Sequence, residues 1–134
     1  MRMIFRKERD KDLFRAYDRA IKSFGKDAPF ISRKEVVKRA IESGAERYYV
    51  TYEEAHRNVR RLMNGKPLKC KNLHKQAMYM SLYEAVKRYG ELYPELPFNR
   101  ILIRVLAEEK APRFFISLER ALLLLSNTPK SEAA

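Results

Sequence analysis

The sequence predicts a mainly α-helical fold, with about six helices in one compact domain spanning residues 1–134. Hydrophobic residues make up 46% of the chain and charged residues 34%, a balance typical of a folded protein. The chain contains only four Gly and six Pro, and its apolar residues recur at helical spacing. A third observation is an internal similarity, because ERYYVTYEEA at 46–55 returns as PRFFISLERA at 112–121.

The first predicted helix lies near the N-terminus and is amphipathic. Its apolar residues fall at spacings of three and four, which places them on one face of a helix. The helix should end at Gly25, because glycine commonly follows the last helical residue. The apolar positions are Leu13, Phe14, Tyr17, Ile21 and Phe24.

Two similar segments, about 30–64 and 97–126, are each predicted to form a helix, a short strand and a second helix. A shift of 66 residues aligns 37–55 with 103–121, with five identical and six conservatively replaced positions. The extended pieces are RYYV and RFFI, which are rich in β-prone residues. Because so short a strand is unstable alone, we expect the two to pair in a minimal two-stranded sheet around a pseudo-twofold axis. The side chains buried there would be Tyr48, Tyr49, Phe114 and Phe115.

Capping residues set the expected helix boundaries in the first segment. Ser32 precedes Glu35 by three residues, which is the spacing of a capping box. Thr51 and Glu54 repeat this spacing at the start of the next helix. Gly44 should end the first of these helices, and Asn64 with the glycine after it should end the second.

Three further helices complete the expected order. One covers residues 72–89 and should stop at Gly90. The second segment should begin a helix at Asn99 and another at Ser117, since amide and hydroxyl side chains accept hydrogen bonds from the first helical amides. The tail, residues 127–134, is expected to fray.

The last helix carries four consecutive leucines at 122–125, which point around the whole helix axis. A helix that is apolar on every side must be covered. Either the core of this chain covers it, or it forms the contact of a homodimer.

The formal net charge of +12 and the pI near 10.0 favour a polyanionic partner. No apolar run is long enough to predict a membrane span, and the first residues do not read as a secretory signal. A lone cysteine, Cys70, permits neither an internal disulfide nor a cysteine-rich zinc site. A cytoplasmic protein is therefore expected.

Signatures of catalysis are missing from the sequence. It has no glycine-rich phosphate loop, and its two histidines, His56 and His74, lie outside any metal-ligand spacing. We therefore expect no enzymatic activity, no cofactor and no metal site.

A long stretch without acidic residues, 55–83, is the sharpest functional signal. Its arginines project from the helix after Thr51, on the side opposite the apolar positions. Guanidinium groups there suit phosphates or guanine edges, and an amide could contact a base. The predicted binding residues are Arg57, Arg60, Arg61, Asn64, Lys66, Lys69, Lys71 and Lys75.

These patterns together predict a small non-enzymatic nucleic-acid-binding protein, with DNA somewhat favoured over RNA. The helix after Thr51 is similar to the second helix of a helix-turn-helix, although the connection before it is longer than the usual turn. A protein-interaction adaptor or dimeric regulator, docking through the leucines at 122–125, is the alternative. A protein bound to anionic membrane surfaces is a third interpretation.

Overall fold

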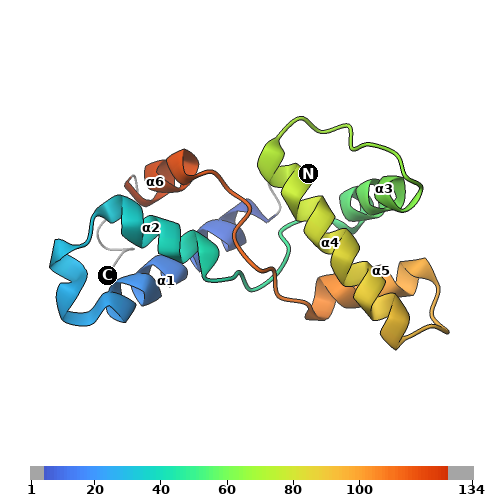
Figure 1. The fold of residues 1–134 in the computed structure, drawn as a ribbon, viewed down its shortest axis with the longest axis horizontal. Helices are drawn as coiled ribbons and strands as arrows, with labels where there is room; N and C mark the ends of the chain where they lie inside the picture. The colour runs from blue at the N-terminus through green and yellow to red at the C-terminus, as the bar shows by residue number, and fades with distance from the viewer. Residues whose placement is uncertain (1–4, 127–134) are drawn as a thin grey trace. The chain divides into compact units, whose positions relative to one another are not determined.

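The computed structural model of the protein describes residues 5–126. These residues form six α-helices and one 3₁₀ helix (Figure 1). The mainly helical fold and the expected helix number are thereby confirmed. The predicted frayed tail, 127–134, lies outside the described residues. The elements are α1 (Arg6–Phe24), η1 (Gly25–Phe30), α2 (Arg33–Glu42), α3 (Tyr52–Met63), α4 (Leu73–Leu92), α5 (Phe98–Glu108) and α6 (Leu118–Ser126).

The chain divides into two compact units. Unit 1 takes residues 5–46 and 112–126, and unit 2 takes residues 47–111. Each predicted repeat contributes one helix to each unit, since α2 packs against α6 and α3 packs against α5. The single domain and the repeat stay predictions.

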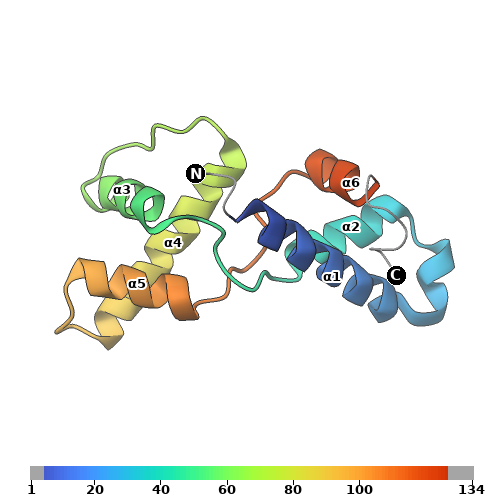
Figure 2. The same cartoon turned by 180° about the vertical axis from the view of Figure 1, so that it is seen from behind.

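Unit 1 is built on the contact between α1 and α2, with α6 on α2 (Figures 1 and 2). Its core comes from the apolar stripe of each helix, and Phe114 is only 1% exposed. The amide of Phe114 donates to the carbonyl oxygen of Ile41 at 2.9 Å, which fixes the chain before α6 against the end of α2. Buried side chains of α1 and α2 include Leu13, Ala16, Ala20, Val36, Val37 and Ala40.

Unit 2 packs α3, α4 and α5 against one another. Val59 of α3, Leu82 of α4 and Leu102 of α5 are each fully buried at its centre. Tyr48, 1% exposed, shares a hydrogen bond of 2.6 Å with the hydroxyl of Ser81. This bond gives the buried phenol a hydrogen-bond partner inside unit 2.

Several predicted caps are present. The hydroxyl of Ser32 accepts from the amide of Glu35 at 3.1 Å, and that of Thr51 accepts from the amide of Glu54 at 3.2 Å. Ser117 accepts from the third residue of its helix in the same way, at 3.1 Å. Each cap satisfies an amide that has no partner within its own helix.

Two predicted boundaries are wrong. Helix α4 continues through Gly90 to Leu92, where a Cβ on Gly90 would lie 3.8 Å from the end of the Ile101 side chain. The glycine therefore lies within the helix, beside α5, and does not end it. Asn99 is not the cap of α5, because Pro97 occupies the N-cap and helical residues begin at Phe98.

The expected two-stranded sheet is not found in the described residues. No residue of RYYV or RFFI lies in a strand, and a single bridge residue stands two positions before each piece, at Ala45 and at Ala111. Their burial nevertheless follows the same order along both pieces, with Tyr48 and Phe114 buried and the aromatic residue after each half-buried. Since each piece lies in irregular backbone, its core contribution comes from these anchoring side chains rather than from strand pairing.

Helix α6 is only partly covered. Ala121 and Leu125 are buried, whereas Leu123 is 56% exposed. Of the two alternatives for the leucines, coverage by the core of this chain does not apply to Leu123, and the homodimer contact stays a prediction. Within residues 5–126, no helix combines the length and apolarity needed to cross a membrane.

Candidate nucleic-acid interface

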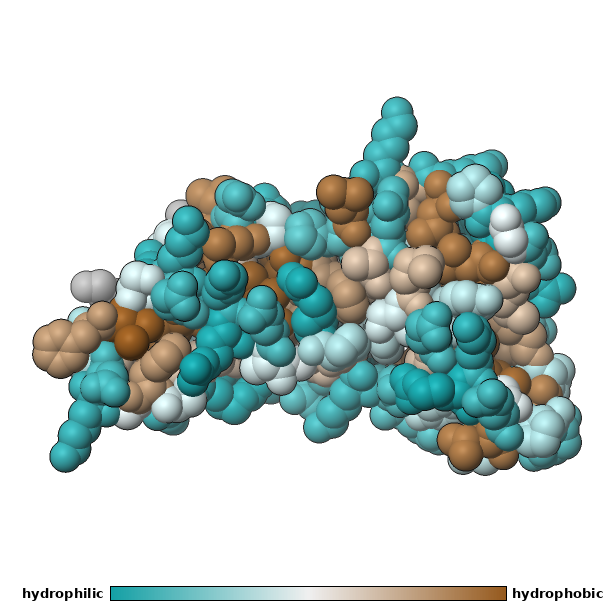
Figure 3. Space-filling model, viewed as in Figure 1, coloured by the Kyte–Doolittle hydropathy of each residue, from teal (hydrophilic) through white to brown (hydrophobic). Residues whose placement is uncertain are grey.

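The candidate interface begins on α3, whose direction is set by its cap at Thr51 and its buried residues Ala55 and Val59. With those side chains in the core, the arginines of α3 are left at the surface. Arg57 and Arg60 are exposed, and Arg61 is half-exposed. In Figure 3, hydrophilic side chains stand out from the surface of unit 2 with hydrophobic ones between them.

Helix α3 ends at Met63 with Asn64 as its C-cap, and residues 64–72 form an irregular connection to α4 (Figure 1). Gly65 adopts a left-handed backbone, with φ +72°, which turns the chain away from the helix axis. Two hydrogen bonds then hold the connection against the helices. Arg61 Nε donates to the Pro67 carbonyl oxygen at 2.9 Å, and Gln76 Nε2 donates to the Cys70 carbonyl oxygen at 2.7 Å.

A hollow of about 300 Å³ lies between α3, this connection and the start of α4. It gathers four cationic side chains that are separate in sequence: Arg57, Arg61, Lys69 and Lys75. We call it the cationic hollow. Its other lining residues are Glu54, Asn58, Cys70 and Tyr79.

The neutral amides beside the cationic hollow are already engaged in hydrogen bonds within the protein. Asn58 Nδ2 donates to the carbonyl oxygen of Glu54 at 2.8 Å, so this amide is used within its own helix. Asn72 Oδ1 accepts from the amides of His74 and Lys75 at 2.9 and 3.1 Å, which caps α4. An anion in the hollow would therefore meet side-chain cations rather than uncapped helix amides.

The stretch without acidic residues, 55–83, carries seven lysine and arginine side chains: Arg57, Arg60, Arg61, Lys66, Lys69, Lys71 and Lys75. None of them forms an ion pair with a carboxylate of the described residues. Basic residues elsewhere do form such pairs, for example Arg88 with Glu109 at 2.9 Å and Arg104 with Glu108 at 3.3 Å. Repulsion among these unpaired cations is lowered when a phosphate binds between them.

The predicted site residues fall into three places. Arg57, Arg61, Lys69 and Lys75 line the hollow. Arg60 turns toward α5, with its Cζ 5.3 Å from the ring centre of Phe98. The other three, Asn64, Lys66 and Lys71, are exposed in the connection and do not line the hollow.

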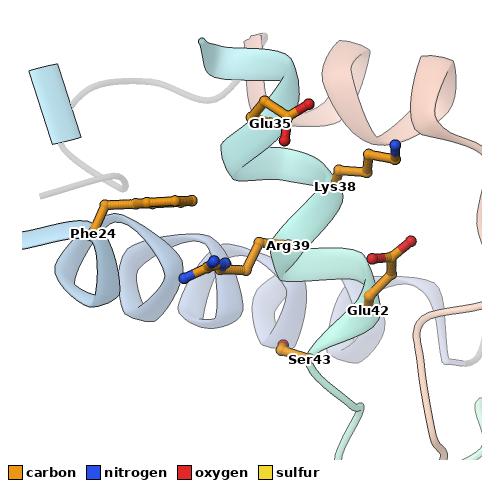
Figure 4. Close-up of a pocket in the computed structure, with 6 residues that line it drawn as sticks. All are labelled: Phe24, Glu35, Lys38, Arg39, Glu42 and Ser43. Atoms are coloured by element: carbon orange, nitrogen blue, oxygen red, sulfur yellow. The ribbon is translucent and has the colours of Figure 1, made fainter. Parts of the chain in front are cut away.

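Unit 1 contains a hollow of similar size with a different charge. About 370 Å³ in volume, it is lined by two cations, two carboxylates, Phe24 and Ser43. Figure 4 shows Arg39 reaching from α2 toward Phe24, and its Cζ lies 4.0 Å from the ring centre. The carboxylates of Glu35 and Glu42 balance Lys38 and Arg39, so this hollow does not favour a polyanion.

Sequence reasoning missed three residues beside Arg60. His56 of α3 meets Phe98 edge-on, with ring centres 5.1 Å apart. His56 Nε2 also donates to Asn99 Oδ1 at 3.3 Å. The sequence did contain one signal for this contact. Pro97 marks the start of α5, so the Asn99 side chain is not needed as a cap and can form a hydrogen bond elsewhere.

A connection of nine residues, 43–51, separates α2 from α3. A helix-turn-helix uses three or four, so the two helices do not form this motif. The described residues also contain no group of three or more His, Cys, Asp or Glu side chains that could hold a metal ion.

Comparison with known proteins gives no relative for this chain. No protein-family model, no curated protein and no solved structure matches it.

Proposed function

We propose that this protein binds nucleic acid without catalysing a reaction. The binding surface comprises the exposed side of α3, the 64–72 connection and the first turn of α4. Phosphates would be held by the cations of the hollow, with Lys66 and Lys71 adding charge at its edge. Release of condensed counterions from the nucleic acid supplies most of the affinity of such a surface.

The observation that carries the proposal is the excess of positive charge in the cationic hollow, which four cations and one carboxylate, Glu54, line together. Four cations from three elements face one space, and among the described residues no carboxylate pairs with them. The hydrogen bond between Arg61 and Pro67 holds part of this arrangement in place before a ligand arrives. Preformed positions reduce the entropy lost on binding.

The direct test removes charge from the hollow and measures binding to DNA and RNA by fluorescence anisotropy. The variant carries Arg57→Gln, Arg61→Gln and Lys69→Gln. A matched control carries Arg15→Gln, Arg19→Gln and Lys22→Gln, which removes the same charge from the exposed side of α1.

We expect the hollow variant to bind about 30-fold or more weakly than the wild type, and the control to change by about 3-fold or less. Equal losses in both variants would mean that only total charge matters. Undiminished binding by the hollow variant would overturn the proposed site.

A second candidate function is self-association or docking through α6. The observation that favours it is Leu123, a large apolar side chain that is 56% exposed between two half-buried leucines, Leu122 and Leu124. Its single exposed leucine gives a small apolar surface, and the larger charge signal favours nucleic acid.

A further inference from the structure

Beside the cationic hollow, on the next face of α3, lies a cluster of planar side chains in contact with one another. Arg60 places its guanidinium over the ring of Phe98, with 5.3 Å from Cζ to the ring centre. The His56 ring meets the same phenyl ring edge-on and also contacts Tyr52, with ring centres 5.6 Å apart. We call these residues, together with Asn99, the planar cluster.

Asn99 adds hydrogen-bonding capacity to the planar cluster. Its Oδ1 accepts from His56 Nε2 at 3.3 Å, and this contact fixes the orientation of the amide. The two N–H donors on its Nδ2 make no hydrogen bond to another described residue. Because Asn99 is exposed, these donors face solvent, where a ligand acceptor can reach them.

This combination suits an unpaired nucleobase. A guanidinium plane or an aromatic ring binds a base through the base's flat face, and an oriented amide binds its edge. In a duplex, the flat faces are covered by the neighbouring base pairs. The planar cluster can therefore contribute to binding only when a base is free of its stack.

The cationic hollow and the planar cluster are positioned so that one nucleic-acid strand can contact both. Arg57 and Arg61 face the hollow, while His56 and Arg60 face α5, and all four lie within six consecutive residues of α3. The two pairs point about 100° apart around the helix axis, so only the distance between adjacent faces of α3 separates them. A flexible single strand can cross that distance with a phosphate on one side and a base on the other.

We propose that the ligand is single-stranded nucleic acid, with a phosphate in the cationic hollow and a base stacked on the Arg60–Phe98 pair of the planar cluster. This inference rests on the proposed function and narrows it. Stacking accepts every base, so the binding has little sequence preference. Single-stranded DNA and single-stranded RNA share this chemistry and form separate arms of the test.

The test compares Phe98→Leu with the wild type on a labelled single-stranded DNA, a single-stranded RNA of the same sequence and the corresponding DNA duplex. Leucine keeps apolar volume at the start of α5 and removes the ring. Phe24→Leu is the matched control, because it removes a ring under Arg39 in unit 1. Circular dichroism confirms that each variant is folded.

We expect Phe98→Leu to weaken binding to single strands by about 5-fold or more and to leave duplex binding within about 2-fold, while Phe24→Leu changes neither. The inference is overturned if Phe98→Leu binds single strands as well as the wild type does, or if the wild type prefers the duplex. Failure of the wild type to bind any of the three ligands would instead overturn the proposed function itself.

A second measurement does not depend on the folding of any variant. A single strand containing 5-bromouracil is photocrosslinked to the wild-type protein, and the modified peptides are identified by mass spectrometry. Crosslinks at the aromatic residues of the planar cluster support the inference. Crosslinks confined to peptides of unit 1 overturn it.

Discussion

Arg61 Nε donates a hydrogen bond to the carbonyl oxygen of Pro67 at 2.9 Å, six residues further along the chain. The bond joins the last turn of α3 to the connection that carries Lys66, Lys69 and Lys71. One arginine thus both lines the cationic hollow and positions the loop that contributes Lys69 to it.

Replacing Arg61 by lysine keeps the charge but loses the planar guanidinium that reaches Pro67. We expect faster amide hydrogen exchange across residues 66–71 and nucleic-acid affinity about 3-fold lower, because the loop is held less firmly. Stability should fall by less than about 1 kcal/mol, as for a partly exposed hydrogen bond. Arg57→Lys is the control, since no hydrogen bond from the Arg57 side chain to the described residues is present. Unchanged loop exchange in Arg61→Lys would contradict this role.

The buried phenol of Tyr48 makes stability depend on alkaline pH. Burial raises the pKa of Tyr48 above its ordinary value of 10.0, while the hydrogen bond with Ser81 lowers the pKa in part. The folded state therefore holds the proton more tightly than the unfolded state. The contribution of Tyr48 to stability is complete below pH 10 and is lost as the pH rises through the folded-state pKa.

Tyr48→Phe is expected to be about 1 kcal/mol less stable at neutral pH, because the bond to Ser81 is lost. It should also lose less stability than the wild type between pH 10 and 12. Ser81→Ala should lose more over that interval, since it removes the contact that lowers the phenol pKa. Urea unfolding at several pH values measures both, and identical alkaline losses in all three proteins would contradict the assignment.

Gly90 and Gly65 should respond in opposite ways to alanine. Gly90 lies inside α4, and an added Cβ would make an ordinary contact with Ile101 at 3.8 Å. Gly90→Ala should therefore stabilise the protein by about 0.5–1 kcal/mol. Gly65 has φ +72°, so Gly65→Ala should destabilise it by about 1 kcal/mol. Urea midpoints that shift in the same direction would show that one of these backbone conformations is wrong.

Two leucines of α6 allow its role in core packing and its role in association to be tested separately. Leu125 is 9% exposed, so Leu125→Ala should cost about 2–4 kcal/mol of stability. Leu123 is 56% exposed, so Leu123→Asp should change stability by less than about 1 kcal/mol. Light scattering of the wild type and Leu123→Asp then tests the second candidate function. A wild-type dimer that becomes monomeric in Leu123→Asp would support association through α6, and a monomer in both would remove it.

Local signals in the sequence were sufficient for most helix starts. Ser32 and Thr51 were predictable as caps because the groups that bond there lie three residues apart in the chain. The position of Gly90 inside α4 was not predictable, because it depends on packing beside Ile101 rather than on the conformational preference of glycine. The two-stranded sheet was expected from β-prone residues, yet Tyr48 is anchored by Ser81, a partner 33 residues away in sequence.

The charged residues of the candidate site were predictable from the sequence, but the neighbours that each of them contacts in the fold were not. The acid-free stretch identified Arg57, Arg61, Lys69 and Lys75, which the fold brings around one hollow. Helical periodicity placed Arg60 on the same face as Arg57. Its contact with Phe98 follows from the packing of α5 beside α3, and spacing within a single helix carries no information about that neighbour.

The most direct measurement of the central claim is the salt dependence of binding to single-stranded and duplex DNA. If five cations of the acid-free stretch contact phosphates, the logarithm of the association constant should fall against the logarithm of salt concentration. The expected slope is about −3.5 for the single strand and about −4.5 for the duplex. The Arg57→Gln, Arg61→Gln, Lys69→Gln variant should reduce either slope by about two to three. A wild-type slope near zero, or a slope unchanged in the variant, would contradict the account.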